Sequence, residues 1–267
     1  MKKNAFRNSV VQAGFKQDSL AGKLSAVGGL LPENKEVVLD VCRDWLATGR
    51  TALKADFLST SKVQTLLVRH TKLIDELLAS LYNEATKSAE KVAVIAVGGY
   101  GRSEMFPYSD IDLLFLYDPS AEARATEIVE TLLYILWDLG FKVGQAHRTI
   151  EEALELAKSD ITIRTNLLDA RFVVGNKILF ESFRMRFDSE IIQGKVTEFI
   201  EAKLAERDGR HHRFGDSRYM LEPNVKEGKG GLRDAHILWW LARAAYSLAS
   251  NSELVERGLV SREEYKS

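Results

Sequence analysis

Apolar side chains recur with a helical period over much of the N-terminal third of the chain. Across residues 33–88 they return every three or four positions, which predicts amphipathic helices with one break near residues 59–61. His70 falls on this apolar stripe, where a packed histidine is more common than a metal ligand. The stripe of the second helix comprises Val63, Leu66, Leu67, Ile74, Leu77, Leu78 and Leu81.

Residues 1–34 show no sustained period. They carry a net charge of +3 and include four glycines and one proline. Terminal segments of this kind are commonly poorly ordered, which favours a solvated tail over a binding arm. We therefore predict a flexible lead-in over residues 1–34, followed by a folded domain with N-terminal helices over residues 35–175.

Two unbroken apolar runs lie in the middle of the chain. Residues 92–97 and 113–117 are too short for typical helices and predict strands buried on both faces. Further short strands are predicted at 141–148 and 171–174. Helices are predicted at 120–139 and on both sides of Asp160, with Thr149 and Glu152 forming a capping box for the first of that pair. This pattern predicts an α+β fold, with a small mixed sheet flanked by helices.

The remainder, residues 176–267, is predicted to be mostly helical. One helical stretch covers 177–207 with an interruption near Gly194, and a clear helix covers 232–250. Between them, Arg210-His211-His212-Arg213 is predicted to be a solvated turn, because adjacent histidines do not share a helical face and make a poor metal pair. The chain stops inside a helical pattern, so we expect it to be part of a longer protein.

Composition narrows the class of protein only modestly. The chain has 267 residues, 45% of them apolar and 28% charged, with a net charge of −1. Near neutrality and the lack of a basic stripe argue against a nucleic-acid partner. No apolar run approaches the roughly 20 residues that span a bilayer. The single cysteine, Cys42, forms no internal disulfide and favours a cytoplasmic protein.

Two carboxylates follow a glycine-rich turn at the start of the second strand. Asp110 and Asp112 are two residues apart, so in a strand they share a face. Close carboxylates repel each other, and a divalent cation such as Mg²⁺ resolves that conflict by binding both of them together with substrate phosphates. Gly98 and Gly99 just upstream could present backbone amides to those phosphates.

The string Gly-Gly-Tyr-Gly-Arg-Ser-Glu-Met-Phe-Pro-Tyr-Ser-Asp-Ile-Asp-Leu-Leu-Phe-Leu, residues 98–116, resembles the DNA-polymerase-beta-like nucleotidyltransferases. Within that superfamily it is most similar to the bacterial PII uridylyltransferases. The resemblance implies transfer of UMP from UTP to a tyrosine of the PII signalling protein, with release of pyrophosphate. It also implies that Asp110 and Asp112 are catalytic and bind Mg²⁺, with a second Mg²⁺ activating the attacking hydroxyl.

Two further residues near the glycine turn are candidate phosphate ligands. Arg102 has the planar fork that suits phosphate oxygens, and the alternative is a surface ion pair with Glu104. Ser103 could donate its hydroxyl to a phosphate or cap the following turn. We predict nucleotide binding by Gly98, Gly99, Arg102 and Ser103.

A second block of the resemblance covers residues 221–234, Leu-Glu-Pro-Asn-Val-Lys-Glu-Gly-Lys-Gly-Gly-Leu-Arg-Asp. It is a locally basic, glycine-rich loop that enters a helix, which makes it a candidate anion site; a helix cap plus an ordinary loop is the alternative. The family commonly has proline where this chain has Lys229. We predict nucleotide contacts from Lys226, Gly230, Gly231 and Arg233.

The third carboxylate usual in polymerase-beta-like enzymes is missing from its expected strand. Residues 141–149 contain no Asp or Glu, although His147 and Arg148 lie there as candidate base and phosphate contacts, with a packed His147 favoured. The full-length uridylyltransferases also have a His-Asp hydrolase signature, and this chain has no His-Asp dipeptide. Two alternatives therefore stand beside uridylyl transfer: another acceptor, or a catalytically weak nucleotide-binding module. Candidates for the missing ligand are Asp160, Asp169, Glu222 and Asp234.

Overall fold

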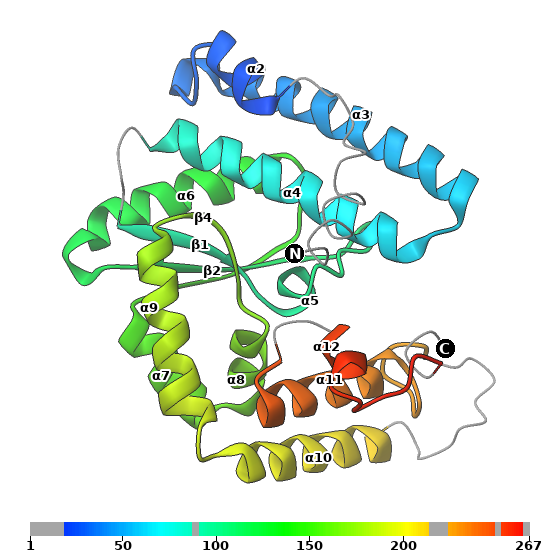
Figure 1. Ribbon diagram of the computed structural model, residues 1–267. Helices are drawn as coiled ribbons and strands as arrows, with labels where there is room; N and C mark the ends of the chain where they lie inside the picture. Colours follow the sequence, from blue (N-terminus) through cyan, green and yellow to red (C-terminus); the bar gives the residue numbers. More distant parts are fainter. Residues whose placement is uncertain (1–18, 87–90, 214–223, 249–251, 264–267) are drawn as a thin grey trace, which may run out of the picture.

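The computed structural model describes residues 19–86, 91–213, 224–248 and 252–263. In the described part, the first half of the chain has two long antiparallel helices followed by two strands, and the second half is helical apart from two further strands (Figure 1). In chain order the elements are α2 (Leu20–Ala26), η1 (Pro32–Asn34), α3 (Lys35–Thr60), α4 (Val63–Ala85), β1 (Val92–Ala96), α5 (Gly98–Gly101), β2 (Ile111–Tyr117), η2 (Pro119–Ala121), α6 (Glu122–Asp138), β3 (Val143–Arg148), α7 (Ile150–Ser159), α8 (Ile161–Leu168), β4 (Arg171–Gly175), α9 (Lys177–Phe187), the π-helical η3 (Asp188–Ile192), α10 (Val196–Arg213), α11 (Leu232–Tyr246) and α12 (Ser252–Glu256).

The four strands form one mixed sheet in the order β3-β2-β1-β4. Strand β1 runs antiparallel to both β2 and β4, while β2 and β3 are parallel and are joined through helix α6. A parallel pair requires such a crossover, because its strands start at the same edge of the sheet. The predicted small mixed sheet and α+β class are confirmed.

Both faces of the sheet are covered by helices. Val92, Val94 and Ala96 of β1 belong to a core shared with α2, α3, α4 and α6, whereas Ala93 and Ile95 belong to a core shared with α7 to α11. All five residues of β1 are fully buried, as the unbroken apolar run predicted. The alternation of side chains along one strand therefore joins two helical layers.

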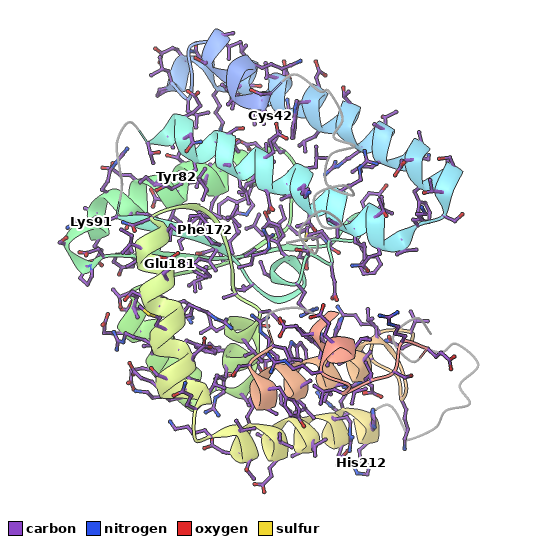
Figure 2. The ribbon with its side chains drawn as sticks, in the orientation of Figure 1. Cys42, Tyr82, Lys91, Phe172, Glu181 and His212 are labelled. Atoms are coloured by element: carbon purple, nitrogen blue, oxygen red, sulfur yellow. The ribbon has the colours of Figure 1, made fainter. Side chains whose placement is uncertain are left out.

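The predicted break in the N-terminal helices is confirmed at Ser61, whose left-handed backbone (φ 52°) ends α3. His70 is buried on α4 and its Nδ1 lies 2.9 Å from the Met105 carbonyl oxygen, so the packed assignment holds. Cys42 is also fully buried, on the face of α3 that turns toward α4 (Figure 2). Burial raises the pKa of its thiol to about 11.

Three local predictions are wrong. Residues 20–34 are not a flexible lead-in, because Leu20 and Leu24 of α2 are fully buried in the first core; residues 1–18 lie outside the described part. Residues 210–213 form the last turn of α10 rather than a solvated turn, with Arg210 and His211 buried. Helix α11 ends at Tyr246 rather than residue 250 because Ser247 is left-handed.

Among the residues that the structure describes, no helix combines the length and apolar character needed to cross a membrane.

Candidate active site

The glycine turn follows β1 directly. The Val97 amide donates to the Asp112 carbonyl (3.1 Å), which fixes the start of the turn beside β2. Gly98 has φ +56°, a conformation that side-chain-bearing residues rarely adopt. At Gly101 a Cβ atom would collide with the Asp169 carbonyl oxygen. The turn therefore needs glycine at position 98 for its backbone angle and at position 101 for lack of space. The first amides of α5, like those of any helix, have no acceptor within the helix.

The Asp112 carboxylate lies between two glycines. A Cβ on Gly98 would lie 3.3 Å from Asp112 Oδ2, and a Cβ on Gly144 of β3 would overlap Asp112 Oδ1. Gly144 is the register partner of Asp112 across the parallel strand pair. Asn166 of α8 also approaches, since its Oδ1 lies 3.8 Å from the same Cβ position at Gly98. The sequence did not indicate Gly144 and Asn166 as site residues. The register of β2 and β3 brings Gly144 beside Asp112, and the packing of α8 brings Asn166 beside Gly98.

The charges of Asp110 and Lys226 both act on the Asp112 carboxylate. The pKa of Asp112 is raised, first by burial and then by repulsion from Asp110, while Lys226 and Arg102 act in the opposite direction. Asp110 is exposed and Asp112 half-buried, with Ile111 between them fully buried. The two carboxylates are therefore close enough to repel each other, and the loop before α11 supplies a nearby cation.

A cavity of about 220 Å³ adjoins Asp112. Its polar lining comes from β3 and α8 as well as β2, and it includes Arg148, one of the candidate phosphate contacts. His147 on the same strand instead packs on Tyr117, with ring centroids 4.2 Å apart, and burial lowers its pKa, so the packed alternative holds. The polar lining residues are Asp112, Gln145, Arg148 and Asn166.

The oxygen donors of this site suit a hard divalent cation such as Mg²⁺. Asp112 is a half-buried carboxylate whose pKa is raised by burial and then by repulsion from Asp110, and a bound cation would relieve both effects. In the described part of the chain no three His, Cys, Asp or Glu side chains gather as a potential metal group. The two carboxylates would therefore hold the ion together with substrate oxygens or water.

None of the described candidates for a third carboxylate joins this pair. Asp160 caps α8 by accepting from the amides of Thr162 (2.7 Å) and Ile163 (3.0 Å). Asp169 is buried in an ion pair, and Asp234 bonds with Arg210 and His211. Glu222 lies outside the described residues.

Arg102 is engaged in a buried ion-pair network. Its Nε donates to Glu104 Oε2 (2.8 Å) and its Nη1 to Asp169 Oδ2 (2.7 Å). The guanidinium also stacks over the ring of Trp240, whose Nε1 donates to the same Asp169 oxygen at 2.8 Å. The pairing with Glu104 that stood as the alternative is present, and Arg102 links the glycine turn to α11. A phosphate contact from Arg102 would have to use Nη2 and stays a prediction.

Ser103 ends the glycine turn. It has φ +63°, and its amide donates to the Tyr100 carbonyl at 3.1 Å. This hydrogen bond does not involve the Ser103 hydroxyl, so the nucleotide contact proposed for this side chain also stays a prediction.

The glycine-rich loop before α11 is closed by its own hydrogen bonds. The amides of Lys226 and Glu227 donate to Asn224 Oδ1, and those of Leu232 and Arg233 donate to the carbonyls of Val225 and Lys226. The Gly230 amide donates to Asp234 Oδ2 (2.7 Å) and the Gly231 amide to the Gly228 carbonyl (2.9 Å).

The amides of Gly230 and Gly231 are thus already used as donors within the loop, and a nucleotide contact from these two glycines stays a prediction. Arg233 is also engaged, with Glu227 (3.3 Å) and over the Trp240 ring. Of the four residues expected from this loop, only Lys226 acts on the acid pair through its charge.

The fold and the acid pair define a nucleotidyltransferase domain of the polymerase-beta-like type. Residues 79–168 match the family model for the nucleotidyltransferase domain, and residues 198–267 match the model for GlnD PII-uridylyltransferase. The chain is homologous over most of its length to bifunctional uridylyltransferase/uridylyl-removing enzymes.

Two such relatives give the extent of the similarity. The enzyme of Erythrobacter litoralis (strain HTCC2594) is 44% identical over 241 residues, which cover 86% of this chain and 26% of the relative. The enzyme of Bradyrhizobium sp. (strain ORS 278) is 41% identical over 262 residues, covering 92% of this chain and 28% of the relative. The chain thus spans about a quarter of the length of these curated relatives.

Proposed function

We propose that this chain carries the transferase activity of a PII uridylyltransferase. It moves UMP from UTP to a tyrosine hydroxyl of the PII signalling protein in the cytoplasm, with Mg²⁺ and with release of pyrophosphate. The uridylyl group and the PII acceptor are taken from the names of the relatives and of the family model. The residues themselves support phosphoryl chemistry but do not select a base.

One observation carries the proposal: the Asp112 carboxylate, beside Asp110, lies against the glycine turn and within range of the Lys226 charge. Bound Mg²⁺ would neutralise the triphosphate and polarise its phosphorus. Asp110 and Asp112 hold the ion. The glycine turn and Lys226 hold the phosphates, and Gly144 leaves room for the carboxylate to keep its orientation. Positioning and charge neutralisation account for most of the rate in such reactions.

The test is transfer of label from UTP to purified PII with Mg²⁺, beside an Asp112→Asn control. Labelled PII with the wild-type chain and background labelling with Asp112→Asn supports the proposal. Labelling of other acceptors, or from other nucleotides, while PII stays unlabelled would reject the PII assignment and keep the transferase.

A catalytically weak nucleotide-binding module is the second candidate. It is favoured by the lack of a three-residue acid or histidine group among the described residues. Saturable UTP binding without turnover on any acceptor would select it.

A further inference from the structure

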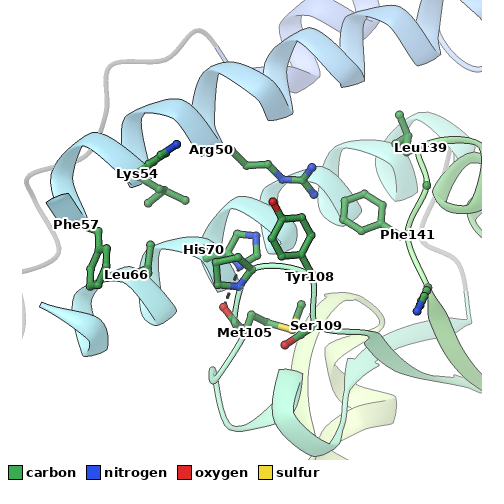
Figure 3. Close-up of a pocket in the computed structure, with 14 residues that line it drawn as sticks. Arg50, Lys54, Phe57, Leu66, His70, Met105, Tyr108, Ser109, Leu139 and Phe141 are labelled. Atoms are coloured by element: carbon green, nitrogen blue, oxygen red, sulfur yellow. Dashed lines mark hydrogen bonds between the residues drawn. The ribbon is translucent and has the colours of Figure 1, made fainter. Parts of the chain in front are cut away.

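A second cavity, of about 720 Å³, shares no lining residue with the one beside Asp112. Its walls come from α3, from α4, from the loop that leads to Asp110 and from residues 139–142 (Figure 3). Its volume lies within the range of about 300–1,000 Å³ that is typical of small-molecule sites.

All the charged side chains that line this cavity are basic. Arg50, Lys54 and Lys142 line it, and no Asp or Glu does. Within the described part of the chain no carboxylate forms an ion pair with any of these three cations. The Arg50 guanidinium lies 5.3 Å from the centroid of the Phe141 ring, and Figure 3 shows it reaching toward Tyr108 as well. Cations without carboxylate partners beside aromatic rings favour an anionic ligand.

The inner wall has both apolar surface and a polar acceptor. Leu53 and Met105 are buried there, and His70 is 6% exposed. Since a carbonyl can only accept, His70 Nδ1 must donate to the Met105 oxygen (2.9 Å), and burial lowers the pKa of the imidazole. The neutral ring then has Nε2 as a hydrogen-bond acceptor. At the rim, Tyr108 is fully exposed with a left-handed backbone (φ 70°), a conformation that is costly for a tyrosine.

We propose that this cavity binds a small molecule that combines a flat ring with a phosphate or carboxylate group. The anionic group is held by Arg50, Lys54 and Lys142. The ring packs between Tyr108 and Phe141 and against the apolar inner wall. This site is separate from the one at Asp112, and its binding does not rest on the function proposed above.

An occupant would touch both segments that hold the acid pair. Ser109 lines the cavity and directly precedes Asp110. The Lys142 carbonyl accepts from the Ile111 amide (2.9 Å), two residues before Gly144. The ligand would therefore act as an effector of the acid pair, and only this regulatory step depends on the proposed transferase activity.

Pyridoxal 5′-phosphate is a suitable probe because it has a heteroaromatic ring, a phosphate and an aldehyde. Its aldehyde condenses with a lysine amine to give an imine and water, and borohydride reduces the imine to a stable amine. Peptide mapping by mass spectrometry then gives the labelling rate at each lysine. The variants are Arg50→Ala and, as a matched control, Arg207→Ala, a partly exposed arginine on α10 that does not line this cavity (Figure 1).

We expect Lys54 and Lys142 to be labelled about tenfold faster than the exposed Lys62 and Lys72, a ratio equal to about 1.4 kcal/mol. Arg50→Ala should remove that preference and Arg207→Ala should keep it. Even labelling of all exposed lysines, or an unchanged preference in Arg50→Ala, would overturn the site. Protection of Lys54 and Lys142 by UTP with Mg²⁺ would overturn its separateness. Failure of UTP to protect Lys226 would count against the proposed function alone.

Discussion

Gly144→Ala is the sharpest test of the geometry at the acid pair. The substitution adds one methyl group on edge strand β3, where the backbone is compatible with alanine. That methyl would overlap Asp112 Oδ1, so the carboxylate must leave its rotamer or the strand must shift. An off-rotamer side chain costs about 0.5–1.5 kcal/mol, and a misplacement of about 1 Å at a reacting centre lowers the rate about a hundredfold. Stability should stay within about 1 kcal/mol, because alanine is the better strand residue.

Two assays separate these effects. Denaturant unfolding reports the free energy of unfolding, and calorimetry with UTP and Mg²⁺ reports binding beside kcat/KM for label transfer. Gly209→Ala on α10 is the matched control, because its new methyl meets nothing within 4 Å. Wild-type binding and turnover in a folded Gly144→Ala protein would show that the Asp112 carboxylate does not need this space.

Three further outcomes are expected. Asp169→Asn should lower the free energy of unfolding by about 3–5 kcal/mol, since it leaves Arg102 without its buried partner; a urea midpoint equal to wild type would contradict this. Leu24→Ala should lower the free energy of unfolding by about 2–5 kcal/mol in the same assay, because Leu24 of α2 is fully buried. An unchanged free energy of unfolding would mean that α2 is a flexible segment. Without metal, stability should fall as the pH rises through the raised pKa of Asp112, because the folded state holds that proton more tightly; Asp110→Asn should shrink this fall, and an unchanged profile would refute the coupling.

Local patterns predicted the elements well. The apolar run of β1 predicted a strand buried on both faces, and the Thr149 capping box marked the start of α7. The helix break near residue 60 and the mixed sheet were also recovered. Each of these features depends on residues only a few positions apart, which is the range over which backbone sterics and side-chain period act.

Features that depend on distant residues were not predicted. Arg102 pairs with Asp169, which is 67 positions away, so its engagement is invisible to a local pattern. Gly144 faces Asp112 only through strand register. The loop before α11 resembled an anion site because its glycines and cations were visible in the sequence. The internal bonds that occupy its amides depend on the three-dimensional course of the loop.

Helix α11 and the loop before it connect the two halves of the molecule at the acid pair. Lys226 comes from that loop, and Trp240 from α11 shares Asp169 with the arginine of the glycine turn. An expression fragment trimmed to the nucleotidyltransferase match at residues 79–168 would lack the lysine, the indole and the buried aspartate. A fragment made to test the proposed transferase activity should therefore extend through α11.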